Sequence, residues 1–354
     1  GLAGRPLSGG IALTATGSIS PLIGGFDLNM DGTGINLAFG NPAADNLLKG
    51  TVRLTGGIAR TAAGIEARQF QLSNDQLHVL ADGHFASTAA DFRFDLGLTD
   101  LNLVSPSASG ALAITGTAKG DGGAIGLQFS AQVPNGALLG RTLSSGMVGF
   151  TGQVAQGTLA GKLTGGGKLA GQAIALAADI SSADGTDELS NLNFSAGGTS
   201  LIGEVTHQKS GLYQGHLTLD ASDLSTAAAL ALVQASGAAK ADITLTPQGT
   251  TQAVTLAASA RDLKFAGASI STATVAAGIA DAFGVPLVNG NVDAKGVQVG
   301  GTAIENLAGQ AKWDGKETNF SANAGVAGGT KVAAGGALAP IAGGYRVSVG
   351  NASL

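Results

Sequence analysis

Apolar and polar residues alternate along most of this chain. In residues 92–98 the order is FRFDLGL, so that Phe and Leu are separated by charged residues or Gly. A period of two places alternate side chains on opposite faces of a β-strand. The same alternation occurs at Leu13, Phe26, Leu28, Met30, Val52, Leu54, Phe92, Phe94, Leu96, Leu98, Leu217, Leu219, Ile243, Leu245, Val254 and Leu256. It predicts half-buried strands that share one apolar face.

Turn signals separate these strands at intervals of roughly 8–12 residues, as in all-β proteins. Asp-Gly and Asn-Gly pairs favour the positive φ angles of tight hairpins. We expect turns at residues 31–32, 56–57, 82–83, 121–123, 135–136, 165–167, 184–185, 289–290, 314–315 and 328–329. Only residues 225–234 and 279–283 have the pattern of a short helix or helical turn, the first capped by Ser225 or Asp223.

Several phrases recur in a shared order, which predicts loose repeats over residues 7–107, 108–234 and 235–354. The phrase ASGA occurs at residues 108–111 and again at 235–238. No Pro-rich stretch, charge block or change of composition interrupts the pattern. Repeats built from many short strands favour one extended sheet, so we expect a single elongated β-repeat body.

The amino-acid composition further restricts the possible folds. The chain of 354 residues has 58 Gly but only 12 Phe, 2 Tyr and 1 Trp, and 12% of its residues are charged. It has no Cys, which excludes disulfides and thiolate metal sites. The mean hydropathy is +0.27, although no apolar run approaches the roughly 20 residues of a membrane-spanning helix. The sequence begins Gly1-Leu2-Ala3-Gly4 without a signal peptide, which predicts a processed piece or a fragment.

Together these features predict an all-β fold, an elongated curved sheet with an apolar inner groove and few short helices. Frequent Gly permits bulges and sharp curvature. The groove is either filled by its own side chains, as in an ordinary solenoid, or open and able to hold an apolar ligand. The sequence leaves both alternatives open.

A search for catalytic and cofactor-binding patterns identifies no active site, so we expect a protein that is not an enzyme and holds no cofactor or metal. His78, His84, His207 and His216 lack partners at metal-ligand spacing, and we interpret them as solvated. The acidic group around Asp184 and Asp187 lacks the order of a calcium loop. Residues 161–168 depart from a phosphate loop, because Lys162 stands at the first Gly position and Leu169 replaces the Ser or Thr, and we interpret them as strand, Gly turn and strand. The 19 basic and 24 acidic residues give no nucleic-acid footprint.

Three longer stretches carry a family resemblance. They are residues 91–120 (DFRFDLGLTDLNLVSPSASGALAITGTAKG), residues 216–263 and residues 278–315, the last followed by the strand GGYRVSV. In style and order they resemble the TamB group of the AsmA-like family of bacterial intermembrane proteins. The resemblance covers nearly the whole chain and depends on no invariant site.

The resemblance implies a β-taco, a long open β-helical tube with an apolar interior. Such proteins stand in the periplasm, are anchored in the inner membrane by an N-terminal helix, and dock with a TamA-like outer-membrane barrel protein. The implied role is phospholipid transport to the outer membrane and assembly of outer-membrane proteins such as autotransporters. This sequence lacks the anchor, and the segment that docks with the barrel cannot be placed within it.

Two functions follow as hypotheses. In the first, phospholipid acyl chains lie along the alternating apolar residues named above, in a conduit without catalysis. In the second, the chain is a structural or adhesive β-solenoid of a secreted or surface protein whose core is closed. The absence of a strict repeat of about 20 residues counts against the second.

Overall fold

The computed structural model describes residues 8–20, 24–62, 64–341 and 344–353. Residues 1–4 and Leu7, the start of the first expected repeat, lie outside this part. Nearly all of the described chain is β-strand, and its 23 strands form one antiparallel sheet. The sheet is open, because among the described residues β1 (Ser8–Ser20) pairs only with β2, and β23 (Gly344–Ser353) only with β22. The expected all-β class with an open sheet is confirmed.

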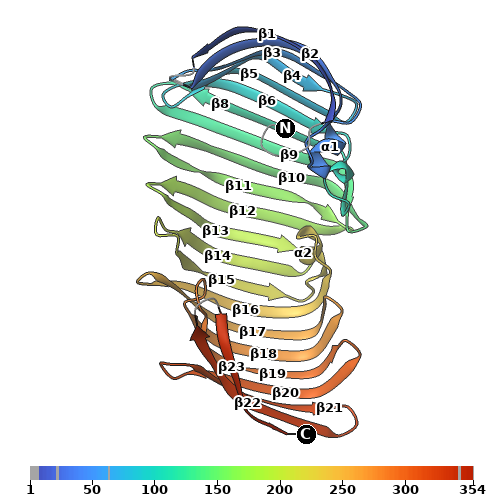
Figure 1. Ribbon diagram of the computed structural model, residues 1–354, viewed down its shortest axis with the longest axis vertical. Helices are drawn as coiled ribbons and strands as arrows, with labels where there is room; N and C mark the ends of the chain where they lie inside the picture. The colour runs from blue at the N-terminus through green and yellow to red at the C-terminus, as the bar shows by residue number, and fades with distance from the viewer. Residues whose placement is uncertain (1–7, 21–23, 63, 342–343, 354) are drawn as a thin grey trace. The chain divides into compact units, whose positions relative to one another are not determined.

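The chain divides into two compact units, residues 1–176 and 177–354, which we describe separately. In unit 1 each strand from β1 to β6 pairs with the next, β6 pairs with β8, and β8 to β11 again pair in order (Figure 1). The short β7 (Ala108–Gly110) pairs with the end of β9. The remaining elements of unit 1 are β2 (Gly25–Ala38), α1 (Pro42–Leu47), β3 (Thr51–Arg60), β4 (Gly64–Ser73), β5 (Leu77–Ala86), β6 (Ala90–Leu98), η2 (Leu101–Leu103), β8 (Leu112–Gly120), β9 (Ala124–Leu138), β10 (Arg141–Ala155) and β11 (Thr158–Leu169).

In unit 2 every strand from β13 to β23 pairs with its successor along the chain. Strand β12 (Gln172–Ala183) contains the boundary between the units. The elements of unit 2 that precede β23 are β13 (Thr186–Ala196), β14 (Thr199–His207), β15 (Tyr213–Ala221), α2 (Ser225–Leu230), β16 (Ala235–Gln248), β17 (Thr251–Phe265), β18 (Ala268–Ala280), β19 (Leu287–Val299), β20 (Thr302–Trp313), β21 (Thr318–Val326) and β22 (Thr330–Ile341).

Six of the ten expected turns are wrong, because residues 31–32, 56–57, 82–83, 135–136, 165–167 and 289–290 lie inside strands. Gly32 illustrates the reason. It lies opposite Leu13, and a Cβ at Gly32 would lie 2.8 Å from Leu13 Cδ1. Here Gly makes room for a neighbouring side chain and does not end the strand. Residues 161–168 likewise belong to one strand, β11, so the expected strand, Gly turn and strand is wrong there.

The helical expectations are confirmed in part. Residues 225–230 form α2, so the expected helix is four residues too long. Its N-cap is Leu224, without a side-chain cap, and Asp223 Oδ1 accepts a hydrogen bond from Ser225 N at 3.0 Å. The expected helical turn at 279–283 is wrong in its first half, because β18 continues to Ala280. Helix α1 was not predicted, although its sequence has two signals of a helix start: Asn41 caps it and Pro42 occupies its first turn.

β-Bulges recur in both units. In β4 one extra residue near Gln69 lies opposite Gly56, and in β17 one near Asp262 lies opposite Gly237. Gln69 and Asp262 have φ angles of 47° and 50°, and their Gly partners have φ angles of 103° and 107°. Gly56 and Gly237 adopt these positive φ angles without the steric cost of a Cβ. These bulges bend the strands and leave one residue of each unpaired in the ladder.

Two copies of the ASG phrase occupy the same local structure. Gly110 and Gly237 have φ angles of 110° and 107°, and each N–H donates to an aspartate at the start of a preceding helical turn. The acceptors are Asp100 Oδ1 at 3.0 Å and Asp223 Oδ1 at 3.4 Å. The boundaries of the expected repeats stay a prediction.

Candidate functional site

Each unit has one apolar face. Residues directly opposite each other in antiparallel strands project from the same face, so the register links side chains across many strands. In unit 1, Leu54 faces Leu72, which faces Val79 in the next strand. Continued in both directions, this row is Leu13, Gly32, Leu54, Leu72, Val79, Leu96, Ile114, Ala131, Val148 and Gly165. We call the face that bears it the apolar face of unit 1.

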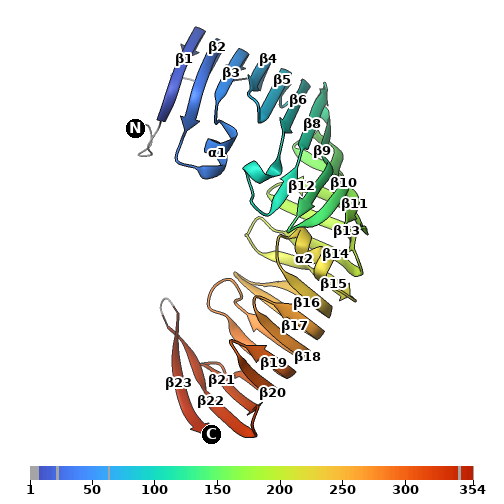
Figure 2. The same cartoon turned by 90° about the vertical axis from the view of Figure 1, so that its right-hand side faces the viewer.

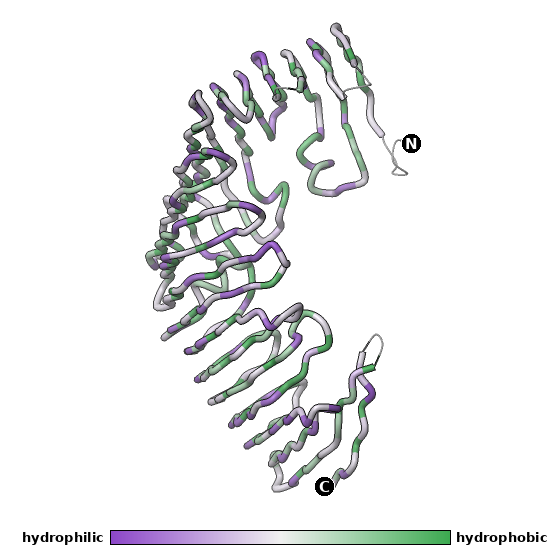
Figure 3. Tube along the Cα trace, turned by 90° about the vertical axis from the view of Figure 1, so that its left-hand side faces the viewer, coloured by the Kyte–Doolittle hydropathy of each residue, from purple (hydrophilic) through white to green (hydrophobic). Residues whose placement is uncertain are grey.

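Unit 2 has a matching row of smaller side chains. Leu219 faces Leu201 on one side and Ala241 on the other. The complete row is Phe194, Leu201, Leu219, Ala241, Ala258, Val275, Val292, Gly309, Ala322, Ala334 and Ala352. The face that bears this row is the apolar face of unit 2. Figure 3 shows the alternation of hydrophobic and hydrophilic residues that produces these faces.

The structure places all sixteen residues of the predicted groove lining on these two faces. On the apolar face of unit 1 lie Leu13, Phe26, Leu28, Met30, Val52, Leu54, Phe92, Phe94, Leu96 and Leu98. On the apolar face of unit 2 lie Leu217, Leu219, Ile243, Leu245, Val254 and Leu256. Whether they contact lipid stays a prediction.

The apolar face of unit 1 is concave around a cluster of Phe side chains. An open hollow of about 320 Å³ there is lined by Ile65, Phe85, Phe92, Phe94, Thr117, Ala118, Leu127, Gln128, Phe129 and Phe150. Ile65 in β4 and Phe150 in β10 are five strand spacings apart, about 24 Å in a flat sheet. A hollow that both residues line therefore requires the sheet to bend toward this face. The arc of the strands of unit 1 in Figure 2 agrees with this bend. We call this site the Phe hollow.

Gly residues give these rings their space. Gly116 lies directly opposite Phe94, and a side chain there would overlap the Phe94 ring. A Cβ at Gly161 would likewise lie 2.5 Å from Cζ of Phe150. The Phe rings therefore lie over Gly backbone, an arrangement that also covers the weakly packing Gly positions of the sheet.

Of the residues that line the Phe hollow, only Phe92 and Phe94 belong to the groove lining predicted from the sequence. Phe129 and Phe150 face each other in β9 and β10, and Phe85 lies at the end of β5. Because these Phe residues alternate with polar residues, the sequence could have predicted that they lie on the apolar face. Their convergence depends on the register of six strands, which no local pattern specifies.

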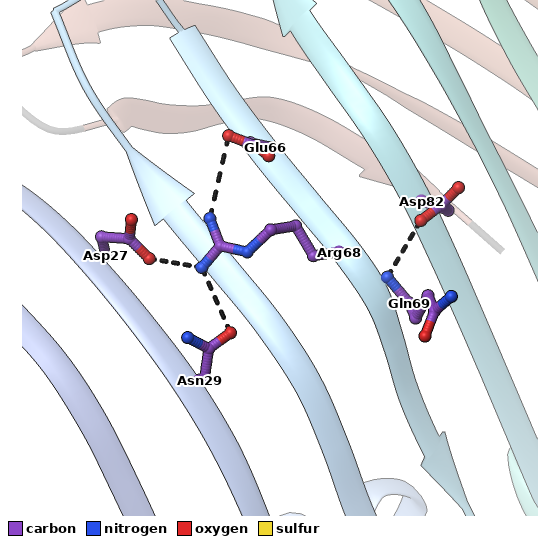
Figure 4. Close-up of polar contacts among 6 residues, drawn as sticks. All are labelled: Asp27, Asn29, Glu66, Arg68, Gln69 and Asp82. Carbon is purple, nitrogen blue, oxygen red and sulfur yellow. Dashed lines mark hydrogen bonds and ion pairs between the residues drawn. The ribbon is translucent and has the colours of Figure 1, made fainter.

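The opposite face of each unit carries most of the charged side chains. In unit 1, Arg68 forms ion pairs with Asp27 and Glu66 and donates to Asn29 Oδ1 at 3.3 Å (Figure 4). The hydrogen bond and charge of Asp27 raise the pKa of Arg68 above its usual value. In unit 2, Lys240 Nζ lies 2.7 Å from Asp220 Oδ2. Such exposed pairs contribute little to stability but keep this face hydrated.

On this polar face, the carboxylate of Asp82 accepts a hydrogen bond from a backbone N–H that a bulge leaves unpaired. The Gln69 N–H, released from the ladder by the bulge in β4, donates to Asp82 Oδ1 at 2.9 Å (Figure 4). Asp82 Oδ2 accepts from Arg93 at 3.1 Å. Asp82 therefore satisfies a backbone donor that would otherwise require water.

The histidines and the acidic group form pairs at the surface. His78 Nε2 lies 2.7 Å from Asp95 Oδ1, and His207 Nδ1 lies 3.5 Å from Asp187 Oδ2. Hydrogen bonds from Ser182 and His207 hold the pKa of Asp187 below its usual value. Within the described ranges, no three His, Asp or Glu side chains are grouped so as to hold a metal ion.

Comparisons with known proteins give no match. No family model, no curated protein and no solved structure matches this chain. Among the residues placed by the structure, no helix is both long and apolar enough to cross a membrane.

Proposed function

We propose that this chain is part of a TamB-like conduit of the AsmA-like family and that its apolar faces bind phospholipid acyl chains without catalysing a reaction. In this proposal the full-length protein is anchored in the inner membrane and spans the periplasm. It works with a TamA-like outer-membrane barrel protein in phospholipid transport and autotransporter assembly. The observation that carries the proposal is the separation of faces, apolar on one side and charged on the other, in both units.

The chemistry of the apolar faces suits an acyl chain. Removing a CH₂ group from water contributes about 0.8 kcal/mol, so a chain laid along such a face is held by its length. In the Phe hollow only Thr117 and Gln128 are polar residues, and the register places their side chains on the opposite face, with Arg93. A ligand held without directional hydrogen bonds can slide and be released, as a conduit requires.

The open face also distinguishes the conduit from a closed β-solenoid. A closed core needs a second layer packed on the apolar face. All strands of the described chain belong to one sheet, and Phe129 on the apolar face of unit 1 is 37% exposed. This observation favours the open groove over the self-filled one.

Site-specific photocrosslinking in cells tests the proposal. A photoreactive residue at Phe94 or Leu219, on the apolar faces, should capture phospholipid. The matched controls are the neighbouring positions Arg93 and Thr218, which project from the polar face. Equal capture at all four positions, or none at Phe94 and Leu219, would contradict the conduit and leave the structural solenoid as the better explanation.

A further inference from the structure

The only Tyr and Trp residues of the chain lie along one edge of unit 2. Tyr213 begins β15, Trp313 ends β20, and Tyr345 is the second residue of β23. Successive strands of unit 2 are antiparallel neighbours, so the starts of odd-numbered strands and the ends of even-numbered strands meet at the same edge. We call the edge that holds these three residues the aromatic edge of unit 2.

The three side chains also belong to the apolar face. Trp313 lies two residues after Ala311, which faces Phe320. Tyr345 lies two residues before Val347, which faces Leu338. Tyr213 is likewise two residues before Gly215, which faces Leu245. Because strand side chains alternate with a period of two, each ring projects from the face that bears the Ala and Val row.

Specific contacts hold the first ring in place. Gln252, which is fully buried, accepts from Tyr213 N at 2.7 Å and donates to Tyr213 O at 2.9 Å. The His207 ring lies 4.8 Å from the Tyr213 ring, and Phe283 meets Tyr213 edge to face at 5.8 Å. Gln252 thus fixes the backbone of Tyr213, and His207 and Phe283 contact its ring.

Tyr345 is held by a contact across the curled sheet. Its hydroxyl donates to the Pro286 carbonyl oxygen at 2.6 Å. Pro286 precedes β19, four strand spacings from β23, or about 19 Å in a flat sheet. The sheet of unit 2 therefore curls toward its apolar face, and Figure 2 shows β22 and β23 turned back in this way.

Tyr and Trp suit a boundary between apolar and wet surroundings, because each joins a large ring to a hydrogen-bond donor. In membranes they are enriched at the level of the lipid headgroups. In unit 2 they occupy one edge, whereas the central row is almost entirely Ala, Val and Leu. Lys209 and Lys316, in the turns that follow β14 and β20, add cationic groups at this edge.

Three carboxylates at this edge accept hydrogen bonds from the protein, and Asp184 and Glu317 add two further negative charges. Asp314 accepts hydrogen bonds from the N–H groups of Lys316 and Glu317 and from Asn319, and Asp281 accepts from Val285 N. Asp187 accepts from Ser182 at 2.6 Å. These hydrogen bonds favour the ionised carboxylates, so the edge carries both negative and positive charges and suits a zwitterionic headgroup better than an anionic one.

We infer that unit 2 binds phospholipids in one orientation, with the headgroup at the aromatic edge and the acyl chains across the Ala and Val centre of the apolar face. This inference rests on the proposed function and adds to it the position of the headgroup. It makes the preferred ligand an amphiphile with a phosphate-containing headgroup, because a plain hydrocarbon has no polar group to meet the hydrogen-bond donors and lysines of the aromatic edge.

Trp313 provides an intrinsic probe, because it is the only Trp of the chain. The full chain is loaded from phosphatidylcholine vesicles that contain either a nitroxide on the headgroup or bromine near the end of an acyl chain. The vesicles are then removed by flotation, and the fluorescence of the lipid-loaded protein is measured. Headgroup nitroxide should quench Trp313 about twofold more strongly than chain-end bromine, because the ring lies at the headgroup level.

A second variant reports from a position far from the aromatic edge. In Trp313→Phe combined with Phe194→Trp, the sole Trp is in register with Leu219, six residues or about 20 Å along the strands from Tyr213. Its quenching preference should reverse. If chain-end bromine is the better quencher at both positions, lipid binds but the inferred orientation is wrong. If neither label quenches either Trp although circular dichroism shows folded protein, unit 2 does not bind lipid and the proposed function fails there.

Discussion

The two units build an uncovered apolar face from different side chains. Unit 1 contains eight of the 12 Phe residues, and five of these line the Phe hollow above Gly backbone. Unit 2 contains both Tyr residues and the Trp at one edge, with Ala and Val across the centre. A sheet of one layer can thus be made apolar with few large rings or with many small side chains.

This difference has an energetic consequence for a bound acyl chain. Apolar burial contributes about 25 cal/mol per Å², so the area presented by the face sets the strength of binding. Phe rings in a concave wall present more area than Ala methyl groups. We therefore expect unit 1 to hold chains more tightly than unit 2, and the following experiments test this contrast.

The largest effect is expected from a charge in the Phe hollow. Phe94→Asp should lower the phospholipid that co-purifies with the chain by about tenfold, because an unpaired carboxylate opposes an apolar ligand. Mass spectrometry of extracted lipid gives the amount. Ala258→Asp, at the centre of unit 2, should lower it less, and Arg93→Asp should leave it unchanged. An equal loss for Phe94→Asp and Ala258→Asp would remove the contrast between the units.

Stability should depend strongly on Gln252, the buried amide of unit 2. Gln252→Ala leaves the N–H and C=O groups of Tyr213 without partners, which should cost about 2–3 kcal/mol of unfolding free energy. Urea denaturation measures the change. The exposed Gln248 is the matched control, and its replacement by Ala should have little effect. A stable Gln252→Ala variant would show that water replaces the amide.

A smaller loss is expected when Gly116, beneath Phe94, is replaced by Ala. The new methyl group would displace the Phe94 ring, and overpacking of this kind should cost about 1–2 kcal/mol. Gly126→Ala is the control, since a Cβ there meets only Lys119 O at 3.5 Å. Similar urea midpoints for the two variants would argue that the ring moves freely.

The smallest effect concerns Asp314 in unit 2. Hydrogen bonds from the N–H groups of Glu317 and Lys316, then from Asn319, lower the pKa of Asp314 in the folded protein. A carboxyl with a lowered folded pKa stabilises the protein above its unfolded pKa, and this contribution is lost as the pH falls through the folded pKa. Asp314→Asn should therefore be slightly less stable than the parent at pH 7 and equally stable at the acidic end of a series of urea titrations. A difference that persists unchanged at low pH would exclude ionisation as its cause.

The sequence predicted the faces well and the turns poorly, and both outcomes have the same physical origin. Alternation depends only on the period of a strand, so Phe92 and Phe94 were placed correctly from their neighbours alone. A Gly within such a strand, such as Gly32 or Gly57, has the same local signature as a Gly in a turn. Only the partner strand distinguishes the two, because it carries the side chain that the Gly accommodates.

The Phe hollow and the aromatic edge required the three-dimensional register. Phe85 and Phe150 are 65 positions apart, and pairing through β6, β8 and β9 brings them to one hollow. Tyr213, Trp313 and Tyr345 share an edge only because the number of strands between them fixes their ends. The number of intervening strands could not be counted from the sequence, because six of the expected turns lie inside strands.

The bulges at Gly56–Gln69 and Gly237–Asp262 have a consequence for how this protein can change over evolution. Inserting one residue into a regular strand reverses the parity of all later side chains and would turn Leu and Phe toward water. A bulge absorbs an odd residue locally, so the strand beyond it keeps its orientation. The bulges therefore mark positions where the chain can gain or lose single residues while the same side chains stay on the apolar face.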